Sequence, residues 1–315
     1  MIEQLAKAVQ EKGTSIVVGL DPQLQFIPES LKKAAIEDRG ESLFAVSDSF
    51  LRFNLAIIDA VCDLVPAVKL QIAMYERFGT PGIEAYRVTA KYAKEKGLVV
   101  IGDVKRNDIG VSAEGYADSH LGTVKFGHTI LSALETDMCT VNPYLGSDGI
   151  EPFLKVCREK NKGIFVLVKT SNPSSGEFQD LKLASGEMLC ERVAAKVSEW
   201  GSTVMHGDWS DVGAVVGATY PEFGRRMREL MPRTWILVPG YGAQGGKGAD
   251  LVPFFDKDGL GAIVNSSRGI IAAWKQEEYK KYGEEHFEEA SRAAVQAMRE
   301  DIAKALDDAA ASRVH

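Results

Sequence analysis

The sequence predicts a closed (β/α)₈ barrel of the α/β class, with loop insertions and a long C-terminal helix. Eight short apolar runs rich in β-branched residues alternate with segments of helical periodicity. The runs are apolar at consecutive positions, as in parallel strands buried on both faces. Polar, charged or glycine-rich residues lie at the end of every run. A barrel gathers all eight carboxyl ends of its strands around one mouth, whereas an open doubly wound sheet gathers only those at its switch point, so the barrel is favoured.

The length of the chain agrees with one large domain. It has 315 residues, of which 45% are hydrophobic and 26% charged, and this composition is ordinary for a globular protein. Length alone would allow two domains, but a barrel of about 250 residues with decorations also fits. Because no linker divides the chain, we expect residues 1–315 to form a single barrel domain.

The expected strands follow from the apolar runs, in chain order. They are Ser15–Leu20, Ala67–Ile72, Leu98–Gly102, Asp137–Val141, Gly163–Val168, Val212–Val216, Trp235–Val238 and Ala262–Val264. Helices are expected between them wherever apolar residues recur with a period near 3.6. These stripes are residues 50–64, 83–93, 154–158, 189–197, 223–230 and, at the C-terminus, 287–306. Such stripes indicate core packing and say nothing about function. Residues 172–183 and 200–211 look like insertions.

Charge and composition exclude several classes of function. The net charge is −7 and the pI about 5.4, and no basic stripe of the kind that binds nucleic acid is present. A small anionic substrate remains compatible, because a local cluster of Lys and Arg decides its binding. No run of about 18 apolar residues predicts a membrane span. The charged N-terminal residues do not resemble a signal peptide, so a cytoplasmic protein is expected.

The cysteines and histidines predict neither disulfides nor a metal site. Cys62, Cys139, Cys157 and Cys190 form no C-x-x-C pair and are expected to be free thiols. The five histidines show no spacing typical of metal ligands. We therefore expect no metal site built from these residues.

The motif Asp103-x-Lys105-x-x-Asp108 is the first candidate for chemistry. Asp103 and Lys105 are two residues apart at the end of an expected strand, so both side chains can point into the barrel mouth. A structural salt bridge is the simplest interpretation of such a motif alone. Charges are rarely buried at such a position without pairing or function, which favours a site.

Lys69 extends this candidate site. It interrupts the apolar run of the second expected strand, where an unpaired ammonium would cost several kcal/mol, roughly. Asp103 and Asp108 are its most economical partners. The sequence thus implies an alternating array of two lysines and two aspartates, although a surface-facing Lys69 remains an alternative.

The loops after the last two strands suggest a phosphate site. Barrels often bind phosphate there through backbone N–H groups at a short helix N-terminus. The segment from Asn265 to Gly269 contains Ser267 and Arg268, and the guanidinium adds a bidentate donor. The segment Gly240–Gly245 matches G-x-G-x-x-G formally. It follows the seventh strand and lacks a downstream ribose-binding acid, so a loop closing over phosphate is preferred to a dinucleotide site.

Together these motifs resemble the orotidine 5′-phosphate decarboxylase family, in its longer bacterial branch. The resemblance rests on IGDVKRNDIG, with GLDP, VNPYLG, KTSNPSSGEFQDL, VPGYGAQGG and NSSRGI, and spans about residues 15–275. It implies a (β/α)₈ barrel that removes CO₂ from C6 of orotidine 5′-phosphate to give uridine 5′-phosphate, in pyrimidine biosynthesis, without metal or organic cofactor. The implied partner besides this nucleotide is a second subunit, with no nucleic acid and no membrane.

The resemblance also assigns roles to the charged residues. Lys105 would protonate C6 as the carboxylate leaves, and Asp103 would lie beside that carboxylate. Lys69 would complete the array and contact the ribose. Asp108 would cross from the other subunit of a homodimer into the neighbouring active site.

Substrate-binding residues follow from the same resemblance. Asp21 is expected at the ribose, and Ile109 and Ser112 follow Asp108. Ser112 stands where the family usually has threonine, and the hydroxyl is kept. The remaining expected substrate-binding residues lie in the strand-end loops: Asn142, then Thr170, Ser171 and Asn172 at the pyrimidine edge, and Gln244, Ser267, Arg268 and Gly269 on the phosphate side.

Two alternatives stay open. Other phosphate-sugar barrels, such as a keto-sugar-phosphate decarboxylase or a hexulose-phosphate synthase, resemble the chain at D-x-K-x-x-D but typically need Mg²⁺. Lys69 and the pair Ser171 and Asn172 favour the nucleotide enzyme over these. A binding or scaffold barrel without turnover is the second alternative, and the intact charged array disfavours it.

Overall fold

The computed structural model describes residues 1–218, 221–242 and 246–313 and contains the expected closed barrel. Eight parallel strands follow one another in the order β1-β12-β11-β10-β7-β6-β3-β2, and the ring closes between β2 and β1. The (β/α)₈ prediction is thereby confirmed. The barrel strands are β1 (Ile16–Gly19), β2 (Ala67–Gln71), β3 (Val99–Arg106), β6 (Met138–Val141), β7 (Gly163–Lys169), β10 (Val212–Val216), β11 (Ile236–Pro239) and β12 (Ala262–Ser266).

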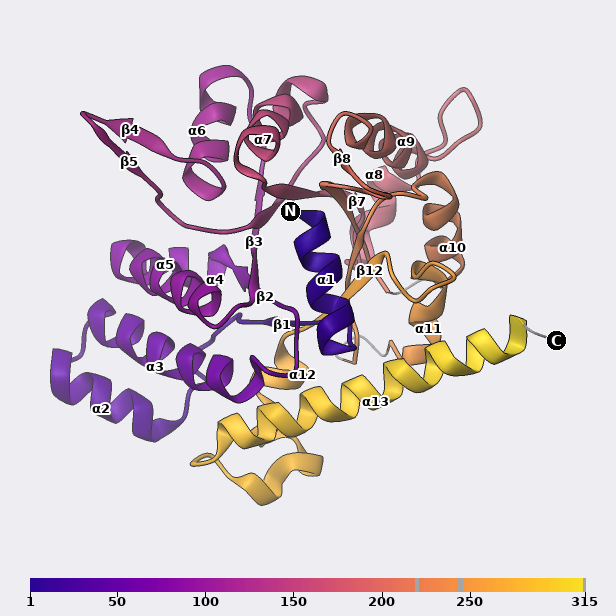
Figure 1. Cartoon of the computed structure of the whole chain (residues 1–315). Coiled ribbons are helices and arrows are strands. Elements are labelled where there is room, and N and C mark those ends of the chain that lie inside the picture. Colours follow the sequence, from indigo (N-terminus) through magenta and orange to yellow (C-terminus); the bar gives the residue numbers. More distant parts are fainter. Residues whose placement is uncertain (219–220, 243–245, 314–315) are drawn as a thin grey trace.

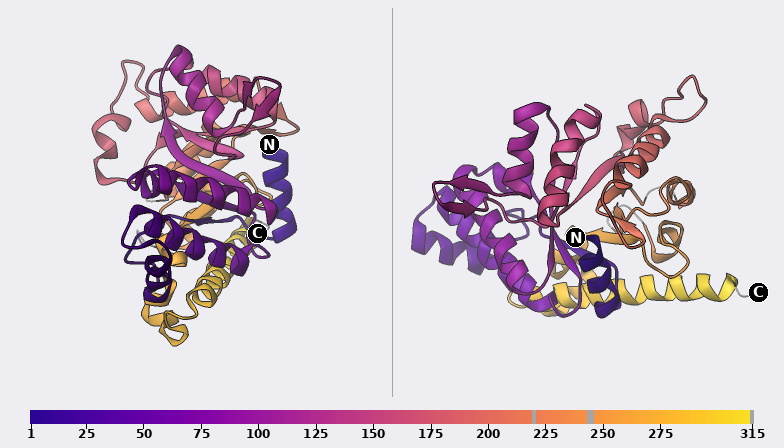
Figure 2. Two further views of the ribbon diagram at one scale, coloured as in Figure 1. Left: turned by 90° about the vertical axis from the view of Figure 1, so that its left-hand side faces the viewer. Right: turned by 45° about the horizontal axis from the view of Figure 1, so that its top comes forward.

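Helices surround the barrel, as Figures 1 and 2 show. The expected helical stripes lie on helices except for residues 62–64, which follow the end of α3, and the long C-terminal helix is α13, which packs against α3, α11 and α12. The helices are α1 (Ile2–Lys12), α2 (Glu29–Arg39), α3 (Leu43–Val61), α4 (Ile72–Glu76), α5 (Gly79–Glu95), α6 (Gly110–His120), α7 (Ser147–Lys160), α8 (Gly176–Gln179), α9 (Leu189–Gly201), α10 (Pro221–Leu230), α11 (Gly248–Leu251), α12 (Arg268–Ile271) and α13 (Phe287–Arg313), with short 3₁₀ turns η1 (Pro173–Ser175), η2 (Val252–Phe254), η3 (Ala273–Lys275) and η4 (Glu277–Tyr282).

Two apolar cores hold the barrel together. The outer core lies between the strands and the surrounding helices. The inner core fills the barrel with side chains such as Val17, Ile101 and Phe165, and α1 packs on it through Ile2 and Leu5. These residues explain why the strands read as continuous apolar runs, because alternate side chains enter the two cores. With α1 covering one end, the mouth formed by the carboxyl ends of the strands is the open end.

The structure adds elements that periodicity did not predict. The hairpin β4 (Val124–Phe126) and β5 (Thr129–Leu131) projects beside α6 in Figure 1. The expected insertion 200–211 contains the two-residue strands β8 (Met205–His206) and β9 (Trp209–Ser210). The insertion 172–183 contains η1 and α8. Segments this short contain too few residues to show a period, so sequence patterns miss them.

Strand β3 is longer than expected and ends irregularly. The apolar run ends at Gly102, yet the strand continues to Arg106, with a shift in its register against β6 between these two residues. Lys105, within the shift, has a φ of 46°. This left-handed conformation is uncommon for residues other than glycine and is frequent at functional sites. None of the described helices is long and apolar enough to cross a membrane.

Candidate active site

A cavity of about 370 Å³ opens at the barrel mouth, within the usual size range of small-molecule sites. Its floor is apolar, with Leu167, Val215 and Leu237 pointing inward from their strands. Charged and polar groups from several strand ends surround this floor. They are Lys69, Asp103, Lys105, Thr140, Thr170, Ser171, Asn172 and Asn265.

A chain of alternating charges lines one side of this cavity. Lys69 Nζ lies 3.4 Å from Asp21 Oδ1 and 3.0 Å from Asp103 Oδ2. The other oxygen of Asp103, Oδ1, lies 2.5 Å from Lys105 Nζ. The order within one chain is therefore Asp21–Lys69–Asp103–Lys105. The predicted pairing of Lys69 with Asp103 is present, and its second carboxylate is Asp21.

The two residues in the middle of this array, Lys69 and Asp103, are buried, so their charges interact strongly. Lys69 is 4% exposed and Asp103 is 9% exposed. Burial alone would lower the pKa of Lys69, but the carboxylates of Asp103 and Asp21 outweigh it and raise that pKa. Burial alone would likewise raise the pKa of Asp103, but the ammonium groups of Lys69 and Lys105 hold it well below its usual value. Both groups are thus charged at neutral pH.

Two neutral residues that the sequence did not single out complete the coordination of Asp103. Gln71 Nε2 donates to Oδ2 at 3.0 Å, and Thr140 Oγ1 donates to Oδ1 at 3.0 Å. The Thr140 oxygen also accepts the N–H groups of Val104 and Lys105, both at 2.9 Å. Thr140 therefore supports the irregular end of β3 and fixes the Asp103 carboxylate at once. The inward-facing period of two on β2 and β6 is the signal that could have found both residues.

Asp108 and the residues after it lie outside this cavity within one chain. Asp108 Oδ1 accepts the N–H of Ile109 at 2.8 Å, and Asp108 makes no ion pair among the described residues. Ile109 is 55% exposed, and Ser112 lies exposed in the first turn of α6. Asn142 also stands apart from the cavity lining, and its Oδ1 accepts the N–H of Tyr144. A role for Asp108, Ile109 or Ser112 in catalysis would thus need a second chain.

The expected phosphate residues lie at the other side of the mouth. Ser267 Oγ donates to Asp21 Oδ2 at 2.6 Å, which links this loop to the charged array. Arg268 and Gly269 begin α12 and line a neighbouring cavity of about 600 Å³ together with Gln276. Gln244 lies outside the described residues. A guanidinium and a helix start beside an open cavity suit an anionic group.

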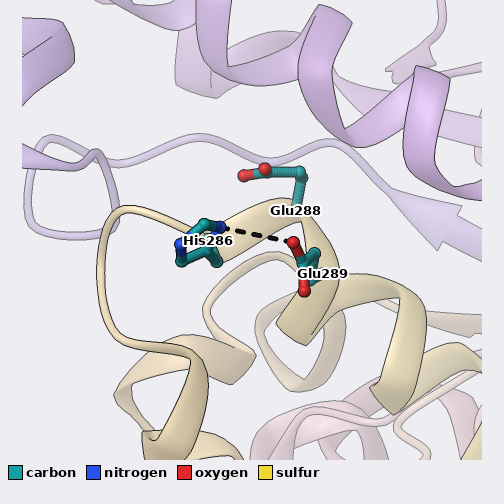
Figure 3. Close-up of side chains that lie close together, drawn as sticks. All are labelled: His286, Glu288 and Glu289. Carbon is teal, nitrogen blue, oxygen red and sulfur yellow. Dashed lines mark ion pairs between the residues drawn. The ribbon is translucent and has the colours of Figure 1, made fainter.

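One group of side chains elsewhere has the composition of a metal site. His286, Glu288 and Glu289 lie together at the start of α13, as Figure 3 shows, and His286 Nδ1 is 3.3 Å from Glu289 Oε1. His286 and Glu289 are exposed and three positions apart on the chain, which is the usual geometry of a weak surface pair. We assign no metal to it.

Comparisons with known proteins identify the family. The model of the orotidine 5′-phosphate decarboxylase / HUMPS family matches residues 14–282. An orotidine 5′-phosphate decarboxylase of Caldicellulosiruptor saccharolyticus is 43% identical over 306 residues, covering 96% of this chain and 98% of the relative. One of Rhodopirellula baltica is 43% identical over 301 residues, covering 95% and 97%. The solved structure of Leishmania donovani OMP decarboxylase has a TM-score of 0.72 at 27% identity and covers 97% of this chain and 98% of its own. The chain therefore belongs to the orotidine 5′-phosphate decarboxylase / HUMPS family.

Proposed function

We propose that this protein decarboxylates orotidine 5′-phosphate to uridine 5′-phosphate and CO₂, and is thus a carboxy-lyase of pyrimidine biosynthesis. The observation that carries the proposal is the array Asp21–Lys69–Asp103–Lys105, whose last three members line a cavity in the size range of small-molecule sites. The relatives named above support the same activity.

Lys105 would supply both charge and proton. When the bond from C6 to the carboxylate breaks, CO₂ leaves and the electron pair stays on C6, which takes a proton from Lys105 Nζ. A preorganised ammonium beside this carbon stabilises the developing negative charge. Asp103 keeps Lys105 close, and its own charge would repel the substrate carboxylate before release, which favours loss of CO₂.

The rest of the mouth would bind and orient the nucleotide. Asp21 and Lys69 present a carboxylate and an ammonium that suit ribose hydroxyls, and the phosphate would lie towards Arg268. Ser171 and Asn172 on the opposite wall would contact the pyrimidine. Binding energy from the phosphate, far from C6, would hold the base in place for reaction.

The direct test is to add orotidine 5′-phosphate in the presence of EDTA and follow the absorbance of the pyrimidine ring. We expect complete conversion, with turnover on the order of 1–10² s⁻¹, because the mechanism needs no metal or organic cofactor. The product is checked as uridine 5′-phosphate. Activity that appears only after Mg²⁺ is added, or only with a sugar phosphate lacking a base, would instead identify a metal-dependent relative on the same barrel.

We further propose a homodimer in which Asp108 enters the neighbouring site, since its carboxylate accepts the N–H of Ile109 but forms no ion pair with any residue that the structure describes. Mixing inactive Lys105→Ala and Asp108→Ala variants and letting subunits exchange should restore about a quarter of wild-type activity. Half of the dimers become hybrids under random exchange, and each hybrid holds one complete site out of two.

A matched mixture controls for this restoration. Lys105→Ala mixed with Asp103→Asn should stay inactive, because both residues belong to the same chain's site and each hybrid site lacks one of them. No recovery in the first mixture, or a monomer by sedimentation, would contradict the crossing of Asp108.

We also propose a domain organisation and a location for this protein. The chain would form a single domain, since α13 and the hairpins decorate the same barrel. It would work in the cytoplasm, in keeping with its four free cysteines.

A further inference from the structure

Residues downstream of the base-binding wall determine how that wall presents its hydrogen-bond donors. The wall consists of Thr170, Ser171 and Asn172, which follow β7 directly. Seven and eight residues after Asn172, Gln179 and Asp180 return to the end of β7. Asp180 Oδ1 lies 2.6 Å from Nζ of Lys169, which is 3% exposed, so this return is anchored to a buried charge.

The Gln179 side chain forms two hydrogen bonds with Thr170. Its Oε1 accepts the backbone N–H of Thr170 at 2.9 Å, and its Nε2 donates to Thr170 Oγ1 at 2.8 Å. A backbone N–H can only donate, so the Gln179 atom facing it must be the oxygen. This fixes the orientation of the amide without any assumption about which end is which.

The orientation of the Gln179 amide determines, through the Thr170 hydroxyl, the orientation of the Asn172 amide. Thr170 Oγ1 accepts from Gln179, so its own hydrogen is available for another partner. Asn172 Oδ1 lies 2.6 Å from Thr170 Oγ1, a distance typical of O–H···O and short for N–H···O. The amide oxygen of Asn172 is therefore occupied, and its Nδ2 has no partner among the described residues. Asn172 thus offers two donor hydrogens on the cavity wall.

We propose that Gln179 is a positioning residue that sets the polarity of the base-binding wall, so that the wall selects a pyrimidine with a carbonyl at C4 over one with an amino group. This inference rests on the proposed function. A carbonyl oxygen accepts from Asn172 Nδ2, whereas an amino group would place donor against donor. Sites with fixed polar groups reject a mismatched ligand because buried groups are left unpaired.

The test uses Gln179→Glu and Gln179→Met. A glutamate carboxylate accepts from the Thr170 N–H but also takes the Thr170 hydroxyl hydrogen, since it has none to give. Asn172 then loses the donor that orients it and is free to turn its oxygen outward. Methionine removes both hydrogen bonds to Thr170. It does not reverse the bond between Thr170 and Asn172, because the Thr170 hydroxyl keeps its hydrogen for Asn172. Glu177→Gln, the mirror-image change on the exposed side of α8, is the matched control.

Dissociation constants are measured for uridine 5′-phosphate, cytidine 5′-phosphate and ribose 5-phosphate. We expect the wild type to prefer the uridine nucleotide, and Gln179→Glu to reduce that preference roughly tenfold or more. Gln179→Met should weaken uridine 5′-phosphate about three- to tenfold with a much smaller change in preference. Ribose 5-phosphate binding should stay the same in all variants, which shows that the barrel and its phosphate side are intact.

The outcomes separate the inference from the proposed function. A wild type that discriminates between the nucleotides, together with a Gln179→Glu variant that discriminates equally well, would overturn the inference alone. The same holds if Glu and Met variants behave alike, because Gln179 would then have only a structural role. A wild type that binds neither nucleotide would overturn the proposed function and the inference with it.

Discussion

Replacing Lys105 with alanine is expected to lower the turnover of orotidine 5′-phosphate by at least about 10⁴-fold. The substitution removes a proton donor and a preorganised positive charge together, and each such group contributes factors of about 10² or more. Among the described residues that line the cavity, Lys69 is the other lysine, and it already bridges Asp21 and Asp103 on the far side of the array. The measurement is a single-turnover assay with the enzyme in excess over the substrate and at saturating concentration.

The Lys105→Ala protein should remain folded, which makes the loss interpretable. The Lys105 side chain is 44% exposed, and Asp103 keeps its bonds from Lys69, Gln71 and Thr140. Alanine and lysine meet the same backbone restriction at a φ of 46°. Lys91→Ala, which removes only an exposed pair with Glu95, should leave activity unchanged. Turnover within tenfold of wild type in Lys105→Ala would rule out this lysine as the acid.

The fold could be predicted because parallel strands buried on both faces are the clearest pattern in the sequence. Their continuous apolar runs gave eight strands, and all eight are present in the barrel. The end of β3 could not be found this way. The apolar run ends at Gly102, and only the pairing of Asp103 with Gln71 in β2 and of Arg106 with Val141 in β6 shows that the strand continues. The exposed hairpin β4–β5 has three residues per strand, too few for a period.

Some residues of the candidate site could likewise be predicted from the sequence, and others could not. Lys69 and Asp103 could be found because a charge within a buried strand needs a partner, and the structure pairs them at 3.0 Å. Gln71 and Thr140 are neutral, and neutral polar residues at strand ends are common, so their contact with Asp103 depends on geometry. Gln179 reaches the wall only through the conformation of its insertion, which no local pattern encodes.

Replacing Asp103 with asparagine is expected to lower the free energy of unfolding by about 3 kcal/mol at pH 7. Removing one partner of a buried ion pair leaves the other charge uncompensated, and this typically costs 3–5 kcal/mol. Four donors converge on the carboxylate, from Lys69, Gln71, Lys105 and Thr140. An asparagine amide turns one acceptor oxygen into a donor and so opposes two of them. Denaturant titrations of both proteins measure the difference.

The size of this difference should depend on pH in a defined direction. Burial acts to raise the pKa of Asp103, but the ammonium groups of Lys69 and Lys105 hold it well below the ordinary value of 3.8. A carboxyl whose pKa is lowered by folding stabilises the protein above the unfolded pKa and loses this effect as the pH falls towards the folded pKa. The difference in free energy of unfolding between wild type and Asp103→Asn should therefore be equal at pH 7 and pH 5 and smaller at pH 3.

An exposed carboxylate provides the control for this pH dependence. Asp38 pairs with Arg52 on the surface and is 57% exposed, so Asp38→Asn should change stability by less than about 1 kcal/mol at any of these values. The difference in free energy of unfolding between wild type and Asp103→Asn could instead stay constant from pH 7 to 3. That result would mean that folding does not lower the pKa of Asp103. The lysines could then not be held as an alternating array, and the electrostatic basis for Lys105 as a proton donor would have to be abandoned.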